Sequence, residues 1–422
     1  MALLSNIQSA PGLSGLSLKF NRYKFIVLFF LQVGILNAVL RLGEESDVTL
    51  FRIVLPFFMV WFFLKNPRVF LGFFASLVVF SIFQVLSHLV NGYPFTIVQF
   101  SFSFHYIVMV FMFLVVRDLW ARYPSALSGF LYWNQVLLIL VLLAQVFFSL
   151  KFPNVPLREN GVNGWYWNHN DTSLALASFV MLSLYLNGIR VNKIINVLAI
   201  ALISYNVSRG ALAGVFVFVL LVFLQDSFSE RRSKVLHFKA SLVVFLMLLV
   251  VLFLLYSESL VDKVLYVVGM LGTIVRLEIG YGVIGSDQVR SMAMIYALQE
   301  TIDSWFVGIG AGNSILMLAS GKYPLIDVIK SIHNMPVQLV LELGLPLIML
   351  ALCMVKRMAK RSYTSLFPIL VGYLLCSLTQ SGGFIVNYFA LVCFYVCILH
   401  KRNNAGDASV VEGRSSWGAT GR

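Results

Sequence analysis

Charged residues are scarce in this chain of 422 residues: they make up 12% of it, and only 18 are acidic. Hydrophobic residues make up 59%, far more than a soluble domain of this length needs, which excludes an ordinary soluble globular fold. The apolar runs are about 16 to 24 residues long, which suits helices that cross a hydrocarbon core ~30 Å thick. The composition therefore predicts an all-α, polytopic membrane protein.

Cysteine is also rare, and the four cysteines all lie in or beside the last three predicted spans. None has the spacing of a zinc site, and none lies in a predicted outer loop, where a disulfide would form. The outer segments contain no Asp-x-Asp motif. We therefore expect no disulfide scaffold, no metal ion and no other cofactor.

About twelve apolar segments are predicted to span the membrane as a helical bundle. A β-barrel is disfavoured because its strands would be shorter and would alternate polar with apolar residues. The predicted spans are 25–40, 48–64, 69–90, 96–116, 127–150, 172–187, 192–206, 210–225, 240–257, 334–354, 364–379 and 384–399.

Basic residues recur in every other connecting segment. If the N-terminus lies inside, the inner segments hold most of the 31 Lys and Arg residues, as the positive-inside rule requires. Both termini are then cytoplasmic, and the net charge of +13 reports topology rather than nucleic-acid binding. The chain divides into spans one to nine (1–257), a large outer loop (258–333), spans ten to twelve (334–399) and a disordered cytoplasmic tail (400–422).

The large outer loop contains a predicted amphipathic helix, "DQVRSMAMIYALQETIDSW", which we expect to lie over the bundle at the membrane interface. Arg290 lies on this helix and, taken alone, reads as a solvated charge. The following "FVGIGAGN" is expected to be a flexible turn with free backbone N–H groups. The predicted apolar face of the amphipathic helix consists of Val289, Met292, Ile295, Tyr296 and Leu298.

A second feature is the turn Ser208-Arg209-Gly210, which follows the short seventh span. At 1.5 Å per residue that span is shorter than a ~30 Å core, so the turn is expected at or slightly below the outer boundary. Gly210 allows the sharp reversal. Arg209 could extend to lipid phosphates or hold an anionic group with both prongs of its guanidinium, and the residues leave both readings open.

The tenth predicted span begins with "SIHNMPVQLVLELGLP". His333 and Asn334 lie where the outer loop enters the span, and Pro336 suits a first helical turn. His333 fits a role in chemistry, and it also fits a helix-capping or interfacial histidine. Glu342 follows roughly 13 Å further along the helix, where a carboxylate needs a partner. An outer-face arginine is a candidate, and a structural ion pair is favoured over direct chemistry.

Three of these segments together resemble the O-antigen ligase and O-antigen polymerase (Wzy-type) superfamily. They are "SRGALAG" at 208–214, an arginine on an outer helix followed by "WFVGIGAGN" at 305–313, and the pair His333-Asn334 with nine residues before Gly344. Their order and spacing match, as do the twelve spans and the large outer loop before the tenth.

The segment "GVNGWYWNHNDTSLAL" also resembles the superfamily's segment before its sixth span. The resemblance covers about 161–345, and the first five spans match only in general character. It implies a metal-independent membrane glycosyltransferase of the C-type fold in the bacterial inner membrane, with a periplasmic active site. Its substrates would be a glycan on undecaprenyl diphosphate and an acceptor glycan, and a chain-length regulator is a further candidate partner.

The resemblance also implies roles for individual residues. Arg209 and Arg290 would hold the donor diphosphate, and His333 would assist the acceptor hydroxyl as a general base. Ser208, Gly210, Asn334, Glu342 and Gly344 would support these residues, and Asn168, His169, Asn170 and Asp171 would shape the acceptor cleft.

Several functions stay open at this point. The segment "WNHND" favours a polymerase, which joins carrier-linked repeat units, over a ligase, which uses the lipid A core. A metal-dependent C-type enzyme would use acidic residues of the first outer loop, but that loop is short; the candidates are Glu44, Glu45 and Asp47. A lipid-glycan flippase would show repeated halves and discontinuous helices, which the sequence does not suggest.

Overall fold

The computed structural model describes residues 21–37, 39–40, 49–92, 97–152, 162–166, 168–187, 193–206, 208–227, 286–320, 322, 332, 334–359, 363–377 and 387–400. Within these residues the regular structure consists of α-helices, without a β-strand. The helices are α2 (Arg22–Ile35), α3 (Leu50–Lys65), α4 (Pro67–Asn91), α5 (Ile97–Arg122), α6 (Pro124–Phe148), α7 (His169–Asn187), α8 (Lys193–Tyr205), α9 (Arg209–Ser227), α12 (Ser286–Asp303), α13 (Asn313–Ala319), α14 (Met335–Ala359), α15 (Tyr363–Ser377) and a final helix, Tyr388–His400.

Each predicted span except 240–257 coincides with one of these helices to within a few residues. That ninth span lies outside the described residues, as do 258–285, the tail after 400, and the acidic residues of the first outer loop. Among the described helices, three stretches are long and apolar enough to cross a membrane: Pro67–Asn91, Ser103–Arg122 and Pro124–Phe148. These helices indicate a membrane protein; the full set of twelve spans stays a prediction.

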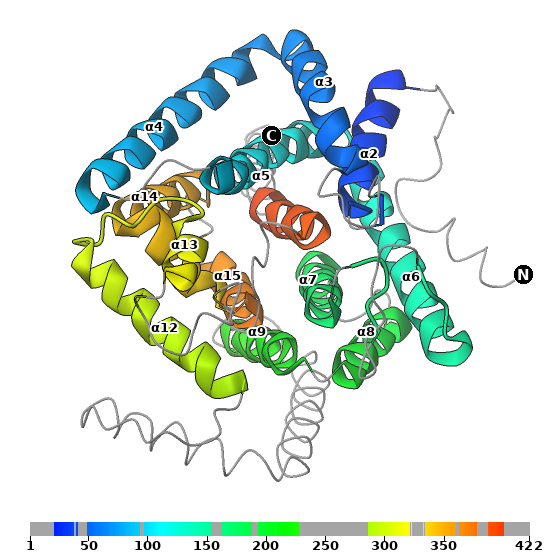
Figure 1. The fold of residues 1–422 in the computed structure, drawn as a ribbon. Coiled ribbons are helices and arrows are strands. Elements are labelled where there is room, and N and C mark those ends of the chain that lie inside the picture. Colours follow the sequence, from blue (N-terminus) through cyan, green and yellow to red (C-terminus); the bar gives the residue numbers. More distant parts are fainter. Residues whose placement is uncertain are drawn as a thin grey trace, which may run out of the picture.

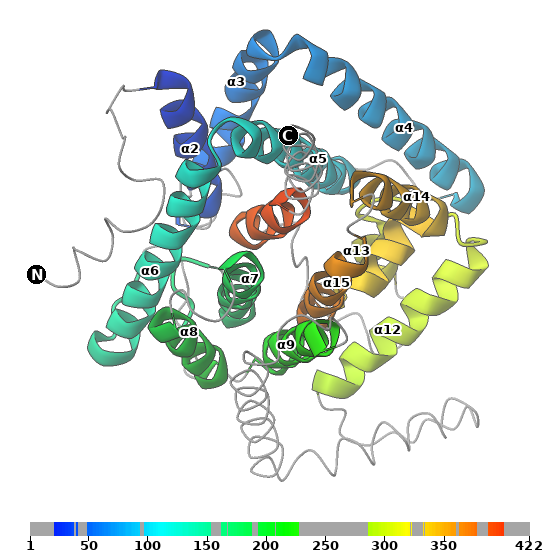
Figure 2. The same ribbon diagram turned by 180° about the vertical axis from the view of Figure 1, so that it is seen from behind.

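In the centre of the bundle lie α7, α15 and the final helix, and α2, α4, α6, α8, α9 and α12 lie around them (Figures 1 and 2). The side chains of α7 are buried all round from Asp171 to Ser183, as expected for a central helix. On the other side of the core, Phe30 of α2 stacks on Phe58 of α3 with ring centroids 3.8 Å apart. Apolar packing around α7 therefore fixes where its first turn lies.

The crossing of α9 and α15 depends on two glycines. A Cβ atom on Gly214 would lie 2.5 Å from the carbonyl oxygen of Gly372, so only glycine permits this approach. Small residues commonly allow such close packing between membrane helices. Gly214 ends the "SRGALAG" segment, and Ala211 within it is fully buried, so this part of the motif serves packing.

Polar side chains gather where α2 begins, α3 meets α4 and α5 ends. The Arg122 guanidinium forms an ion pair with Asp118 at 2.8 Å and donates to Asn66 at 2.7 Å. It also lies over the ring of Tyr23, 5.0 Å from the centroid, and the hydroxyl of Tyr23 donates to Asp118. We call this region the Arg122 end of the bundle.

Asp171 lies in the first turn of α7, and we call the region around it the Asp171 end. His400, the last residue of the final helix, makes ring contacts with Trp120 of α5 and Tyr185 of α7. The C-terminal ends of α5, α7 and the final helix therefore meet at the Arg122 end. The first turn of α7 and the residue that precedes the final helix consequently lie at the Asp171 end.

Candidate functional site

The first turn of α7 is capped by a reciprocal pair of hydrogen bonds. The side-chain oxygen of Asn168 accepts the backbone N–H of Asp171 at 2.9 Å, and its amide donates to the Asp171 carboxylate at 2.7 Å. Asparagine is a favoured N-cap residue because it pairs N–H groups that have no partner within the helix. Asn387, just before the final helix, donates to the backbone carbonyl of Asp171 at 2.6 Å. Two helices of the centre are thus joined at this turn.

Asp171 is only 6% exposed, and its second carboxylate oxygen, Oδ1, has no hydrogen-bond partner among the described residues. Asp171 directly precedes the predicted span 172–187 and so lies outside the predicted membrane-spanning segments. Burial raises the pKa of the Asp171 carboxyl to about 7, against the lowering effect of the hydrogen bond from Asn168. The carboxyl can therefore change protonation near neutral pH.

Asn206, at the end of α8, ties the turn between α8 and α9 to the segment before α7. Its side-chain oxygen accepts the N–H of Val162 at 2.9 Å, and its amide donates to the Val162 carbonyl at 3.1 Å. The same amide lies 3.4 Å from the carbonyl oxygen of His169 and 3.4 Å from the hydroxyl of Ser173. Because Asn206 precedes Arg209 by three residues, the backbone that opens α9 lies beside the start of α7.

A second amide side chain holds the same segment from α6. The Gly164 N–H donates to the side-chain oxygen of Gln145 at 2.8 Å, and the Gln145 amide returns a bond to the Gly164 carbonyl at 3.3 Å. Sequence reasoning did not single out Gln145, Asn206 or Asn387, since a lone amide residue on or beside a helix is also an ordinary packing or capping residue.

The three residues expected to perform the chemistry are only partly placed. Arg209 is the first residue of α9 and Arg290 lies in α12, but the side chains of both are outside the described structure. His333 is outside the described residues altogether. Their neighbours are placed: Ser208 and Gly210 are buried at the start of α9. The structure therefore brings the backbone of Arg209 to the Asp171 end. Binding of a donor diphosphate by Arg209 and Arg290 stays a prediction.

Asn334 caps α14 and connects it to α12. Its side-chain oxygen accepts the N–H of Val337 at 3.1 Å, and its amide lies 3.2 Å from the sulfur of Met294. The sequence offered helix capping as an interpretation of His333, whereas in the structure the neighbouring Asn334 is a capping residue. The contact with Met294 also places the start of α14 beside the helix that carries Arg290.

Glu342 is 1% exposed and accepts hydrogen bonds from neutral groups. Its carboxylate accepts the Tyr106 hydroxyl at 2.9 Å, the Gln338 amide at 3.1 Å, the Ser314 hydroxyl and the backbone N–H of Gly312. Among the described residues these donors form a clamp that joins α5, α13 and α14. The outer-face arginines considered as partners have side chains outside the described structure, so the ion pair stays a prediction. Such a set of donors offsets the cost of burying a carboxylate.

The glycine-rich turn is held in place, contrary to the flexible turn with free N–H groups expected from the sequence. The N–H of Ile309 donates to the carbonyl of Leu341 at 2.7 Å, and that of Gly310 donates to the carbonyl of Glu342 at 3.1 Å. On α4, Gln84 accepts the N–H of Ala311 at 2.8 Å. These N–H groups are therefore not available to a ligand.

The physical reason lies in a break of α14. Gly344 has φ +74° and ψ 163°, which is not helical, and Pro346 has no N–H to pair with the carbonyl of Glu342. The turn supplies the missing partners, and the N–H of Leu345 donates in return to the carbonyl of Phe306 at 2.9 Å. Buried backbone groups are paired in this way although the helix itself cannot pair them.

The face through which α12 packs overlaps the predicted one only in part: Met292 and Tyr296 of the predicted face are partly buried against its core. Ala293 and Ala297 are buried against α13 and α14, whereas Leu298 of the predicted apolar face is exposed. Trp305, just after the helix, is 83% exposed. Small residues allow the close approach between helices, while Leu298 and Trp305 face outward, as large apolar side chains do where a helix meets lipid.

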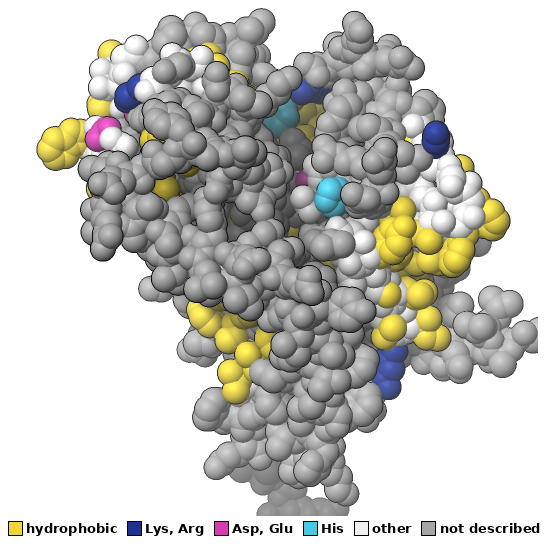
Figure 3. Space-filling view, turned by 60° about the horizontal axis from the view of Figure 1, so that its bottom comes forward, with side chains coloured by type: hydrophobic (Ala, Val, Ile, Leu, Met, Phe, Trp, Pro, Cys, Tyr) yellow, Lys and Arg dark blue, Asp and Glu magenta, His cyan; other side chains and the backbone are white. Residues whose placement is uncertain are grey.

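On the face drawn in Figure 3, histidine side chains lie near basic and acidic ones in its upper half, and hydrophobic side chains form patches mainly at its right side. In the part of the chain that the structure describes, no group of three or more His, Cys, Asp or Glu residues could hold a metal ion. Metal independence itself stays a prediction.

Comparison with known proteins gives no assignment. The chain matches no protein-family model, and no curated protein matches it.

Proposed function

We propose that the chain is a membrane glycosyltransferase of the O-antigen or exopolysaccharide polymerase type. It transfers an oligosaccharide from undecaprenyl diphosphate to a hydroxyl of a carrier-linked acceptor glycan at the periplasmic face of the bacterial inner membrane. The observation that carries the proposal is the bonding of Asn206 to Val162 and to the start of α7. It brings together two of the segments that resemble the superfamily, "SRGALAG" and "GVNGWYWNHND".

In the proposed reaction the acceptor oxygen bonds to the anomeric carbon while the bond from that carbon to the diphosphate oxygen breaks. The leaving diphosphate keeps the electron pair, and Arg209 and Arg290 stabilise its charge through paired N–H donors. His333 accepts the proton of the acceptor hydroxyl, a role suited to an imidazole near neutral pH. Two guanidinium groups supply the charge that a divalent cation supplies in other enzymes.

The acceptor is proposed to lie over the first turn of α7. Asn168, His169 and Asn170 are partly exposed there, whereas Asp171 is buried beneath them. Partly exposed amide and imidazole groups suit the recognition of sugar hydroxyls, because they donate and accept hydrogen bonds. The buried carboxylate would hold the turn rather than contact the sugar.

The test is a transfer assay with purified protein in liposomes and a glycan on undecaprenyl diphosphate. We expect His333→Ala to lower the rate ~10²–10⁴-fold, the usual contribution of a general base, with donor binding retained. Arg209→Lys keeps the charge but loses the planar two-pronged donor, so it should also impair transfer. Gly72→Ala serves as the control, because nothing lies within 4 Å of a Cβ atom there.

The products distinguish the alternatives. Elongation of the carrier-linked glycan supports a polymerase, and attachment only to lipid A core identifies a ligase. Movement of the lipid across the bilayer without a new glycosidic bond identifies a flippase. Full loss of transfer in EDTA, restored by Mg²⁺ or Mn²⁺, would reject metal independence. Normal transfer by the Arg209→Lys and Arg290→Ala variants would reject the diphosphate clamp.

A further inference from the structure

Two buried amide side chains hold the segment before α7 from two different helices. The amide of Asn206 pairs with both the N–H and the carbonyl of Val162, at 2.9 and 3.1 Å, and that of Gln145 pairs in the same way with Gly164, at 2.8 and 3.3 Å. Asn206 is 1% exposed and Gln145 is 5% exposed. Because a primary amide carries both a donor and an acceptor, each side chain takes the place of a neighbouring peptide group. We call these two contacts the amide brackets and residues 162–166 the bracketed segment.

The bracket of Asn206 is connected to the start of α9. Ser208, two residues later, donates its N–H to the carbonyl of Ile203 at 3.3 Å and accepts the N–H of Leu212 at 3.1 Å through its own carbonyl. It is 2% exposed. The connection between α8 and α9 is thus bonded to both helices, and Arg209 follows it as the first residue of α9. A displacement of the Arg209 backbone therefore moves Asn206 as well.

The bracket of Gln145 has no such connection. Gln145 lies in the last turn of α6, and neither of the two arginines proposed to hold the donor lies on that helix. The two brackets are therefore matched in chemistry and burial, and they differ in the element to which each is attached. This difference makes Gln145 the control for Asn206.

Asn206 also reaches the first turn of α7. Its amide lies 3.4 Å from the carbonyl oxygen of His169 and 3.4 Å from the hydroxyl of Ser173. The acceptor is proposed to lie over this turn. One buried side chain thus contacts the bracketed segment and the acceptor turn, and the backbone joins it to an arginine proposed to hold the donor.

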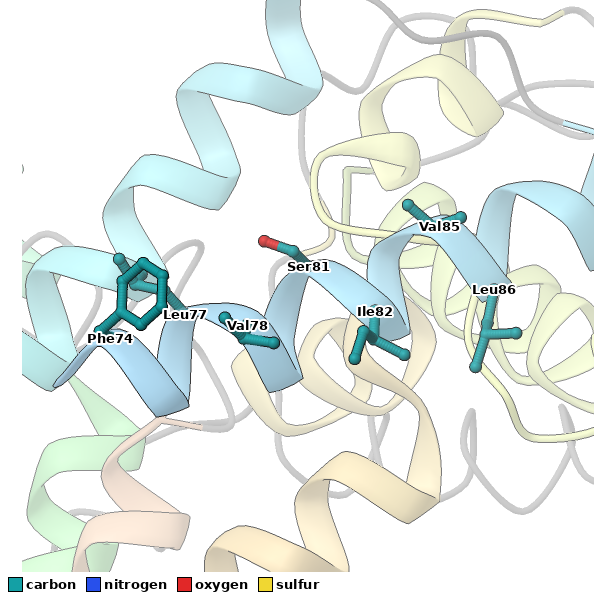
Figure 4. Close-up of a pocket in the computed structure, with 7 residues that line it drawn as sticks. All are labelled: Phe74, Leu77, Val78, Ser81, Ile82, Val85 and Leu86. Carbon is teal, nitrogen blue, oxygen red and sulfur yellow. The ribbon is translucent and has the colours of Figure 1, made fainter. Parts of the chain in front are cut away.

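The groove along one side of α4 offers no comparable link. Its lining residues all belong to that one helix, and Ser81 is the single polar residue among those drawn in Figure 4. The helix lies at the edge of the bundle in Figure 1, and only 11% of its most apolar stretch is buried. Ordinary lipid covers a face of this kind, and it gives no set of hydrogen bonds that could orient a diphosphate or a glycan.

We infer that Asn206 is a positioning residue that links the binding of the donor diphosphate to the binding of the acceptor glycan. The inference rests on the proposed function, which supplies both substrates. A diphosphate bound at the start of α9 restrains the connection to α8 and, through the Asn206 bracket, the bracketed segment and the first turn of α7. The conformational entropy of these parts is then lost before the acceptor arrives, so the acceptor binds more tightly, and by thermodynamic linkage the converse holds.

The first test measures binding without turnover. The probes are undecaprenyl diphosphate, which has no glycan to transfer, and the free oligosaccharide repeat unit from the polysaccharide of the same cell. For the unaltered protein in liposomes, we expect saturating undecaprenyl diphosphate to lower the Kd of the oligosaccharide about fivefold or more, the usual range of such coupling. Gln145→Leu should raise this Kd with and without the lipid and keep the ratio, whereas Asn206→Leu should bring the ratio to about one.

The ratio of the two Kd values decides the outcome. An equal ratio for Asn206→Leu and the unaltered protein would overturn the inference, and so would a ratio lost equally in Asn206→Leu and Gln145→Leu. The unfolding temperature of each variant shows whether it is folded. Asn206→Ala takes the place of Asn206→Leu if the latter does not fold, because the smaller side chain leaves room for water to pair the freed backbone groups of Val162.

The second test needs neither an acceptor nor transfer. Hydrogen exchange of the bracketed segment is followed by mass spectrometry with and without undecaprenyl diphosphate. We expect the lipid to slow exchange in the unaltered protein and in Gln145→Leu, and to have no effect in Asn206→Leu. Transfer by a protein whose exchange the lipid does not slow would reject the inference and retain the proposed function. Slowed exchange in a protein that transfers no glycan would reject the proposed function and retain the link from the diphosphate to the bracketed segment.

Discussion

Gly308 and Gly344 lie backbone to backbone where the glycine-rich turn meets the break in α14. A Cβ atom on Gly308 would lie 2.5 Å from the amide nitrogen of Gly344, and one on Gly344 would overlap the carbonyl oxygen of Val307. Both residues have positive φ, +87° and +74°. This joint holds the Glu342 clamp and the end of α4 in register with α14.

The first prediction concerns this joint. Gly344→Ala should destabilise the protein by at least about 1–3 kcal/mol, because the backbone conformation is one that only glycine adopts readily and the clash is with backbone. Thermal unfolding in detergent measures the loss. Gly72→Ala on α4 is the control and should leave the unfolding temperature unchanged or slightly higher, since its Cβ meets open space. Equal unfolding temperatures for the two variants would show that the close contact of Gly308 and Gly344 does not depend on glycine at position 344.

A second prediction concerns the clamp of Glu342 and Tyr106. Tyr106→Phe should cost about 1–3 kcal/mol, as expected when one hydrogen bond to a buried carboxylate is removed. Glu342→Ala should cost more, because it leaves several buried donors without an acceptor, and Glu342→Gln should fall between them. Unfolding of the single and double variants measures the coupling. Strict additivity of Tyr106→Phe and Glu342→Gln would show that the two residues do not interact.

A third prediction concerns pH. The pKa of the Asp171 carboxyl lies at about 7, above its ordinary value, because the residue is buried. A carboxyl whose pKa is raised on folding binds its proton more tightly in the folded state, so its contribution to stability is lost as the pH rises toward and through 7. We expect the unfolding temperature to fall between about pH 4 and about pH 7, the ordinary and the folded pKa values, then to level off, and Asp171→Asn to remove this component. A stability that rises over the same range would show instead that a cation pairs with the carboxylate.

The fourth prediction concerns topology. A reporter fused at Ser286 should give a periplasmic signal, and reporters fused at Ser233 and Arg357 should give cytoplasmic signals, because basic loops alternate along the chain. Alkaline phosphatase and a fluorescent protein, active on opposite sides, make the comparison direct. A cytoplasmic signal at Ser286 would place α12 on the wrong side for the proposed donor site.

The candidate site was only partly predictable from the sequence. The start of α14 was recognised because Pro336 suits a first helical turn, but the cap itself, Asn334, was not. Glu342 was recognised as a buried carboxylate that needs partners, but its partners were not. Tyr106 is 236 residues away in the chain, and no local pattern specifies such a contact.

The sequence by itself determined the helical class of this protein and most of its helix bounds, because long apolar runs and the prolines and glycines between them act locally. Only the tertiary structure decided that Ala293 and Ala297 are the fully buried residues of the α12 face, since their small side chains allow α12 to pack closely against α14. It likewise decided that the glycine-rich turn is held by α14, because the pairing of its N–H groups depends on a helix break more than thirty residues further along the chain.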